Sequence, residues 1–234
     1  MNFSSIKESI KIVFRPVYYK LFILRVRLLS ILFPSKITNA FQVPIIINNR
    51  NRLTYLKQLI ASLETRGYKN IYIIDNASTW PPLLEYYNSI PYKVFKLKDN
   101  VGFDAIWKTG IHKHFIKDYY VYTDADVVLV EECPTDFMHF LLESMKKDKS
   151  VMKIGLALKI DDLPDWYAKK EEVINWEKKY YTKQVSGNFY LANVDTTFAL
   201  YRPGMNRPAN LMIRMYRTAF PYEIRHMPWY TDSA

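Results

Sequence analysis

The stretch that decides the fold is residues 43–67, VPIIINNRNRLTYLKQLIASLETRG. It begins with a short apolar run at residues 43–47, whose β-branched side chains are typical of a buried parallel strand. A polar turn follows, and apolar residues then recur at helical spacing until Gly67, which is a favourable C-terminal cap. These helical positions are Leu53, Leu56, Leu59, Ile60 and Leu63. The stretch therefore predicts a strand, a short loop and a helix.

The same alternation continues along the chain. Apolar runs at residues 70–74, 92–97 and 119–122 predict three further strands, and helices are expected at about residues 81–87 and 105–115. Strands that alternate with helices over short loops form a parallel, doubly wound sheet. We therefore expect an α/β fold with a Rossmann-like, mostly parallel sheet flanked by helices. Ligands on such sheets bind beyond the carboxyl ends of the strands.

Polar residues follow three of these predicted strands. Residues 48–52 (NNRNR) come after the first strand, Asp75 and Asn76 after the second, and Asp124 and Asp126 after the fourth. In an extended chain, residues two apart point to the same face, so Asp124 and Asp126 are expected to aim into one spot. Two crowded carboxylates repel each other unless a cation lies between them, and a hard divalent cation is the usual one. Capping of turns is the structural alternative for Asp75 and Asn76.

Glycine-rich phosphate loops are absent from the sequence. Neither Gly-x-Gly-x-x-Gly nor Gly-x-x-x-x-Gly-Lys-Ser/Thr occurs. A nucleotide would therefore bind with its diphosphate on a metal ion. In that arrangement Asp75 accepts from a base N–H, Asp124 meets a ribose hydroxyl or the metal, and Asp126 is a direct metal ligand.

The composition bounds the partners and the compartment. The chain has 234 residues and a net charge of +10, which favours anionic partners. Nucleic acid is excluded as the expected partner because no zinc-finger spacing, helix-turn-helix signal or RNA-recognition motif occurs. The single cysteine, Cys133, excludes an intrachain disulfide and suits a reducing compartment, which predicts a cytoplasmic protein.

Residues 1–40 differ from the remainder and predict a basic amphipathic helical appendage. The apolar segment at residues 21–33 is too short and, with Arg25 and Arg27, too charged to span a membrane. Leucines recur at helical spacing, with Lys20 and both arginines off their stripe. These leucines are Leu21, Leu24, Leu28 and Leu32. The pattern predicts a helix lying on an anionic bilayer, at the inner face of the cytoplasmic membrane. A helix packed on the main domain is the alternative.

Four motifs, in the order and spacing in which they stand, resemble family 2 glycosyltransferases of the GT-A fold. They are VPIII with NRLTYL (residues 43–47 and 51–56), IIDNAS (73–78), NVG (100–102) and DAD (124–126). The resemblance implies a nucleotide-diphosphate sugar donor, with a UDP sugar expected, a Mn²⁺ or Mg²⁺ ion, and inversion at the anomeric carbon. It covers about residues 43–140 well, and we expect a GT-A domain at residues 41–234.

The resemblance assigns roles residue by residue. The nucleotide-binding half spans residues 41–130, and the acceptor-side half spans residues 150–234. Asp75 contacts the nucleobase, and Asp124 and Asp126 serve the ribose and the metal. The remaining donor-side residues lie beside the nucleotide: Asn51, Arg52, Asn76, Asn100 and Gly102. In many GT-A enzymes a late histidine completes the metal shell, which here points to His226; a structural histidine is the alternative.

The acceptor side requires a general base that deprotonates the acceptor hydroxyl. Further strands are expected at residues 153–160 and 193–202, and a helix at 169–181. The usual Glu-Asp signature of family 2 is not clearly present. Asp195 is favoured as the base because DTTFAL resembles the acidic entry to the sugar-binding strand of related enzymes, and Asp162 is the second candidate. Asp161 and Glu177 also qualify.

The expected function is glycosyl transfer to a glycan or a lipid-linked acceptor, of the kind that builds bacterial polysaccharide or lipopolysaccharide. A nucleotidyltransferase that makes a nucleotide sugar is one alternative, but it normally needs a glycine-rich loop where residues 48–52 contain no glycine. A non-catalytic glycan-binding relative is the other, and it would be expected to lose the paired aspartates.

Overall fold

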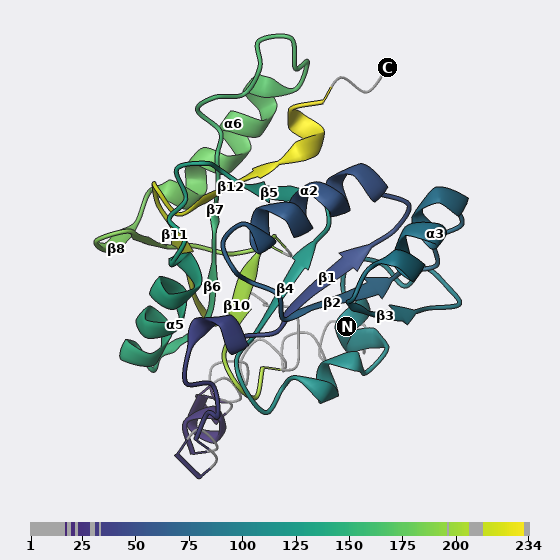
Figure 1. The fold of residues 1–234 in the computed structure, drawn as a ribbon. Coiled ribbons are helices and arrows are strands. Elements are labelled where there is room, and N and C mark those ends of the chain that lie inside the picture. Colours follow the sequence, from purple (N-terminus) through teal and green to yellow (C-terminus); the bar gives the residue numbers. More distant parts are fainter. Residues whose placement is uncertain are drawn as a thin grey trace, which may run out of the picture.

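The computed structural model describes residues 17, 20–21, 23–28, 31–32, 34–195, 197–205 and 213–231. Its core is a nine-stranded sheet with helices on both faces, and a small three-stranded sheet adjoins one edge (Figure 1). The described residues between 17 and 32 are helical, as the leucine pattern predicts, and residues 1–16 of the predicted appendage lie outside the described part. Among the described helices, none is both long and apolar enough to cross a membrane.

The large sheet is mostly parallel, which confirms the predicted fold class. Its strands, in spatial order, are β3 (Lys93–Lys96), β2 (Ile71–Asp75), β1 (Ile45–Asn49), β4 (Tyr120–Asp124), β10 (Ala199–Tyr201), β6 (Val151–Gly155), β11 (Arg214–Thr218), β9 (Phe189–Leu191) and β8 (Gln184–Ser186). The first four are parallel to one another, and β10 enters antiparallel between β4 and β6. The small sheet contains β5 (Val127–Leu129), β12 (Glu223–His226) and β7 (Ala157–Leu158).

Helices cover the two faces of the large sheet with different cores. Side chains of α2 (Leu53–Glu64), α3 (Pro81–Ser89) and α5 (Phe137–Lys147) pack against one face. The other face packs against α4 (Ala105–Lys108), η2 (Ile111–His114) and Val26 of the N-terminal helix. The remaining elements are α6 (Lys170–Lys178) and the short helices η1 (Ala40–Gln42), η3 (Lys179–Tyr181) and η4 (Met227–Trp229).

Three predicted elements differ from the structure. The helix expected at residues 105–115 is divided into α4 and η2 because Gly110 adopts a left-handed conformation with φ 78°. The strand expected at 153–160 begins at residue 151 and divides after Gly155, so that β6 and β7 join different sheets. The strand expected at 193–202 is shortened to β10.

The cause of this last shortening is the path of the segment before β10. Val194 packs directly over Gly155, where an added Cβ would lie 2.1 Å from its Cγ1 atom. The chain therefore crosses β6 here instead of pairing with a neighbouring strand, and Asp195 is carried on this crossing segment.

Candidate active site

The carboxyl ends of β1, β2 and β4 lie side by side, so the polar residues that follow them meet at one edge of the sheet (Figure 1). Asn48 is in register with Asp124, and Asn49 with Asp75. The backbone continues the pairing beyond the strands, because the Ala125 N–H donates to the Asn48 carbonyl over 3.1 Å. The expectation that these loops converge is therefore confirmed in the geometry.

Asp126 lies at the centre of this edge and is only 8% exposed. Its Oδ2 atom is 3.0 Å from Nη1 of Arg52 and 3.5 Å from Nε2 of His226. Burial acts to raise the pKa of the Asp126 carboxyl, but the hydrogen bond and charge of His226, together with the charge of Arg52, outweigh it, so the pKa lies below its usual value. Asp126 is therefore ionised at neutral pH.

Strand pairing brings His226 to Asp126 across a hundred residues of sequence. In the small sheet, β12 pairs with β5 so that His226 lies opposite Val127, and the Met227 N–H donates to the Asp126 carbonyl over 2.8 Å. The His226 and Trp229 rings also meet in a T-shaped arrangement, with their centroids 4.8 Å apart. The imidazole is thus held against the carboxylate by backbone pairing, and its buried Nδ1 atom has no hydrogen-bond partner among the described residues.

A divalent cation fits part of this donor set. Carboxylate and imidazole together are acceptable to Mn²⁺, and Asp126 and His226 supply one of each. Asp124 ends β4 and is half-buried. Within the described residues, no three carboxylate, imidazole or thiol groups form a cation cluster. The fold therefore brings two of the three predicted ligands, Asp126 and His226, into contact.

The predicted nucleotide-binding residues shape the loops of this edge. Asn51 adopts φ 54°, and its Oδ1 atom accepts from the Thr79 N–H over 2.8 Å, which ties the β1 loop to the β2 loop. Buried Asn76 donates to the Gly102 carbonyl and accepts from the Val101 N–H, each over 2.9 Å. These two amides therefore position the loops, and Asn76 does so by joining its loop to the one at residues 100–102.

Asp75 and the loop at residues 100–102 contain the other predicted nucleotide-binding residues. Asp75 is 3% exposed and accepts hydrogen bonds from the Tyr87 hydroxyl and the Ser78 N–H, each over 3.3 Å. The Oδ1 atom of Asn100 accepts from the Gly102 N–H over 3.1 Å, and Gly102 adopts φ 90°, which favours glycine. The loop geometry thus depends on residues that the sequence had singled out.

The candidate bases lie in different surroundings. Asp195 is exposed. Asp162 is bonded to Arg225 and accepts from the Tyr230 hydroxyl over 2.6 Å. Burial acts to raise the pKa of the Asp162 carboxyl, but its hydrogen bonds to these partners and the charge of Arg225 lower it by more. The pKa therefore lies below its usual value. Glu177 is buried in an ion pair with Arg217, which makes it a structural residue.

Lys153 is the site residue that the sequence analysis missed. Its Nζ atom donates to the carbonyls of Val194 over 2.9 Å and Asp195 over 2.7 Å, and it lies 4.7 Å from the centre of the Tyr201 ring. The residue is 1% exposed, and the negative charges of Asp195 and Asp124 both act to raise its pKa. The sequence did contain a signal for this role, because Lys153 is the one charged residue in the apolar strand VMKIG (residues 151–155). A lysine in a buried strand needs polar partners.

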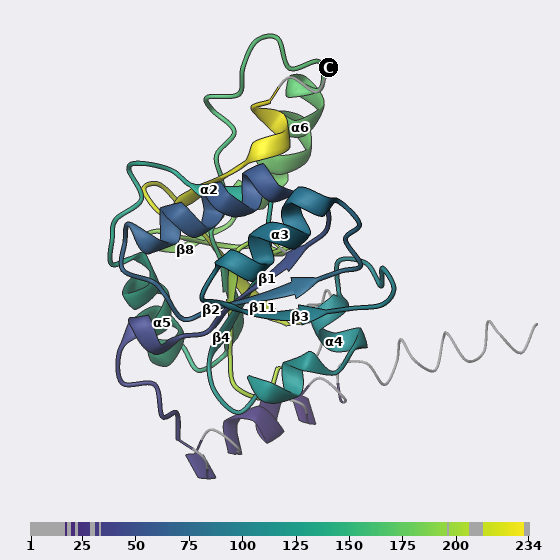
Figure 2. The ribbon, with the colours of Figure 1, turned by 45° about the vertical axis from the view of Figure 1, so that its right-hand side comes forward.

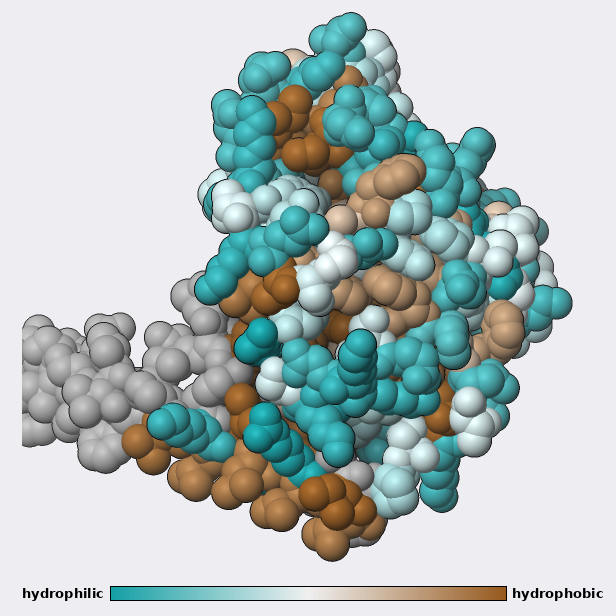
Figure 3. Space-filling model, turned by 90° about the vertical axis from the view of Figure 1, so that its left-hand side faces the viewer, coloured by the Kyte–Doolittle hydropathy of each residue, from teal (hydrophilic) through white to brown (hydrophobic). Residues whose placement is uncertain are grey.

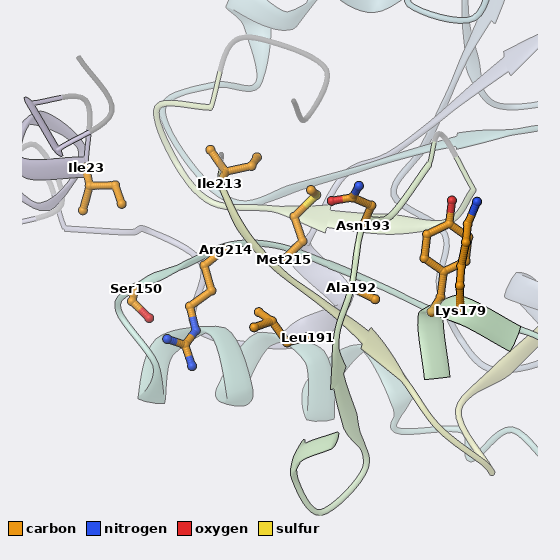
Figure 4. Close-up of a pocket in the computed structure, with 10 residues that line it drawn as sticks. Ile23, Ser150, Lys179, Leu191, Ala192, Asn193, Ile213, Arg214 and Met215 are labelled. Atoms are coloured by element: carbon orange, nitrogen blue, oxygen red, sulfur yellow. The ribbon is translucent and has the colours of Figure 1, made fainter. Parts of the chain in front are cut away.

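Two of the hollows among the described residues are lined mainly by residues 150–229. A groove of about 500 Å³ runs between α6 and η4 and includes Trp176 and Trp229 in its walls. A second pocket, of about 790 Å³, is drawn in Figure 4. Ile23 of the N-terminal helix borders it on one side and Asn193 and Lys179 on the other (Figure 4). Neither hollow contains the Asp126–His226 pair, but the groove adjoins it through Trp229.

The chain matches the family model described as glycosyl transferase family 2 over residues 45–207. A comparison with curated protein sequences finds no match. Among solved structures, a mannosyltransferase from Pyrobaculum calidifontis in complex with GDP-Man and Mn²⁺ is similar, with a TM-score of 0.52 and 14% identity over 97% of this chain and 70% of that one.

Two further solved structures share the fold. GalNAc-T7 with UDP, GalNAc and Mn²⁺ has a TM-score of 0.52 and 13% identity over 79% of this chain and 43% of that one. TarS from S. aureus has a TM-score of 0.50 and 12% identity over 78% of this chain and 36% of that one. The chain spans less than half the length of these two proteins.

Proposed function

Because the chain belongs to glycosyl transferase family 2 and is a glycosyltransferase, we propose that it transfers a sugar from a nucleoside-diphosphate donor, expected to be a UDP sugar, to a glycan or lipid-linked acceptor. The observation that carries the proposal is the Asp126–His226 contact, with Arg52 beside it, at the edge where three parallel strands end. Carboxylate, imidazole and guanidinium together suit a diphosphate and its divalent cation.

On the donor side, each residue has a distinct task. Asp75 receives the base, and Asn100 and Gly102 line the nucleotide pocket, which Asn51 and Asn76 hold open. Arg52 offers its guanidinium to the diphosphate. Asp126, His226 and Asp124 would hold Mn²⁺ or Mg²⁺. When bound, the ion offsets the negative charge of the departing diphosphate.

On the acceptor side, Asp195 is the proposed base. It accepts the proton of the acceptor hydroxyl, whose oxygen forms a bond to the anomeric carbon as the bond to the diphosphate breaks, and the configuration inverts. Lys153 holds the backbone here by donating to the carbonyls of Asp195 and of Val194 before it. Asp162 is the second candidate, but its hydrogen bonds and lowered pKa make it a weaker base.

The N-terminal helix supports contact with an anionic membrane surface. Six apolar side chains on it are between 51% and 71% exposed: Val17, Leu21, Leu24, Leu28, Ile31 and Leu32. At about 100° per residue they form one stripe. Lys20, Arg25 and Arg27 flank this stripe, and Val26 on the opposite face is buried against the sheet. Figure 3 shows apolar side chains gathered along the lower edge of the molecule, where Figure 1 places this helix.

This arrangement is that of an interfacial helix, which lays its apolar side in the acyl boundary and its cations among anionic headgroups. One face of the helix packs on the main domain, and the other is left for the bilayer. We accordingly place the protein at the inner face of the cytoplasmic membrane.

Isothermal titration with UDP and GDP, with and without Mn²⁺, tests the proposed function. We expect nucleotide binding that depends on Mn²⁺, and Asp126→Asn should weaken it by at least about 10-fold because a ligand charge is removed. Asp165→Asn is the matched control, since Asp165 is an exposed aspartate paired with Lys170. Nucleotide binding that persists undiminished in a chelator, or in Asp126→Asn, would contradict the proposal.

A further inference from the structure

The groove between α6 and η4 has the composition of a carbohydrate site. Glu172, Val173, Asn175 and Trp176 from α6 form one wall, and Trp229 from η4 forms the other. Trp176 is 62% exposed, which is unusual for so large an apolar ring. A carboxylate and an amide accompany the two indole rings, so the groove offers both apolar faces and hydrogen-bonding groups.

Both indole rings are held in place. The Lys179 Nζ atom lies 3.0 Å from the centre of the Trp176 ring, which covers one ring face and leaves the other for a ligand. Trp229 meets the His226 ring edge-on at 4.8 Å and packs against the main core. The buried Glu177–Arg217 ion pair ties α6 to β11 directly after Trp176. These contacts fix the part of α6 that carries Trp176 and pack Trp229 against the core.

We propose that this groove binds pyranose rings of the acceptor glycan. A pyranose presents a face of C–H bonds, which stacks on an indole ring, and a rim of hydroxyls, which Glu172 and Asn175 can bind. The inference rests on the proposed function and names a subsite for its acceptor. The main support is that the groove is continuous with the candidate active site. Trp229 in its wall contacts His226, and His226 contacts Asp126, so a sugar in the groove would lie next to the site of transfer.

The position of the N-terminal helix supports an extended glycan as the occupant. Ser35 and Lys36, just after this helix, bond to Asp118 before the start of β4, whereas the site lies beyond its end. Figures 1 and 2 both place the described part of the helix at one end of the molecule and α6 at the other. With this helix on the bilayer, as proposed above, the groove stands farther from the surface than the length of β4, about 16 Å, which favours an extended glycan chain over a sugar attached directly to a lipid.

Titration of tryptophan fluorescence with soluble oligosaccharides tests the inference. The probes are tetra- and hexasaccharides of glucose, galactose, mannose and N-acetylglucosamine. At least one should bind the full chain saturably and more tightly than its monosaccharide. Trp176→Ala should weaken that binding by about 10-fold, as loss of one stacked ring predicts, and Trp176→Phe should retain part of it. Trp166→Ala is the matched control, because Trp166 is 54% exposed and lies outside the groove.

Two results would overturn the inference: none of these oligosaccharides binds, or Trp176→Ala binds as the wild type does. The nucleotide titration separates this failure from failure of the proposed function. A chain that binds UDP or GDP with Mn²⁺ but shows no dependence on Trp176 retains its donor chemistry and loses only the proposed subsite.

Discussion

At the scale of single residues, Lys153 lies within electrostatic range of both Asp195, the proposed base, and Asp124, a proposed metal ligand. It carries a charge in a strand that is otherwise apolar, and its Nζ atom holds the carbonyls of Val194 and Asp195. Burial lowers the pKa of the lysine to about 7, against an ordinary value of 10.5, although the charge of Asp195 acts in the opposite direction. The lysine thus fixes the backbone of the proposed base, and its burial makes it bind a proton less tightly than an exposed lysine does.

The lowered pKa of Lys153 predicts a pH dependence of stability. Below about pH 7 both the folded and the unfolded chain carry the Lys153 proton, and between about pH 7 and 10.5 only the unfolded chain does. Raising the pH in this window therefore favours the folded state of the wild type, by at most about 1.4 kcal/mol per pH unit. Lys153→Met removes this slope. Urea denaturation of both proteins from pH 6 to pH 9 measures it.

Lys57→Met is the control, because Lys57 is exposed on α2. Its free energy of unfolding should follow that of the wild type across the same range. A constant difference between the wild type and Lys153→Met at every pH would show that Lys153 keeps an ordinary pKa.

At the scale of elements, α6 is a polar helix that one buried ion pair anchors. Its first turn carries Glu171 and Glu172 and its last turn Lys178, a distribution that suits the helix dipole but buries little apolar area. The Glu177–Arg217 pair is buried on both sides, and the Tyr180 ring lies 4.3 Å from the Arg217 guanidinium. The wall of the proposed glycan groove therefore depends on this contact.

Removing the carboxylate charge should destabilise the protein. Glu177→Gln leaves Arg217 buried without its counter-ion, which we expect to lower the free energy of unfolding by about 3 kcal/mol. Urea denaturation at neutral pH measures the change. Glu143→Gln, which removes one side of the exposed Glu143–Lys146 pair on α5, is the control and should leave the unfolding midpoint in place. Equal midpoints for the two variants would show that the buried pair does not anchor α6.

At the scale of the whole molecule, the N-terminal helix and the candidate active-site edge lie at opposite ends of the sheet (Figure 2). Parallel strands set this separation, since their amino ends meet at one edge and their carboxyl ends at the other. A protein that rests on a bilayer through the apolar stripe would hold its site away from the surface.

This orientation predicts which surface residues contact lipid. A polarity-sensitive maleimide dye on Leu24→Cys should shift to the blue with vesicles containing phosphatidylglycerol, and the shift should weaken in high salt. The same dye on Trp166→Cys should not shift, although the two positions are 53% and 54% exposed. The native thiol will not compete, because Cys133 is buried and burial raises its pKa to about 11.

Phosphatidylcholine vesicles supply the matching surface without net charge, and the shift at residue 24 should be much smaller with them. A spectrum at residue 24 that no vesicle changes would contradict the membrane contact, and a shift at residue 166 would contradict the orientation.

Local patterns were sufficient to predict the strands and helices of the first half of the chain. The apolar run before Asn48 and the leucine spacing of α2 depend only on neighbours in sequence, and so does the position of Asp75 at a strand end. Because parallel strands end at a common edge, this order alone brings Asp75 and Asp126 to the same side of the sheet. Gly110 was the local exception, since its left-handed conformation divides a helix that the apolar pattern continues.

By itself, the sequence determined the strand–helix order, the edge that carries the site and the apolar stripe of the N-terminal helix. Only the tertiary structure decided that β12 brings His226 to Asp126, that Lys153 holds the backbone of Asp195, and that α6 faces Trp229 across a groove. The physical reason is the separation of the contacting residues along the chain. Periodicity indicates only which face of one element is buried. These contacts join residues 40 to 100 positions apart, and they depend on how the strands of the two sheets pair.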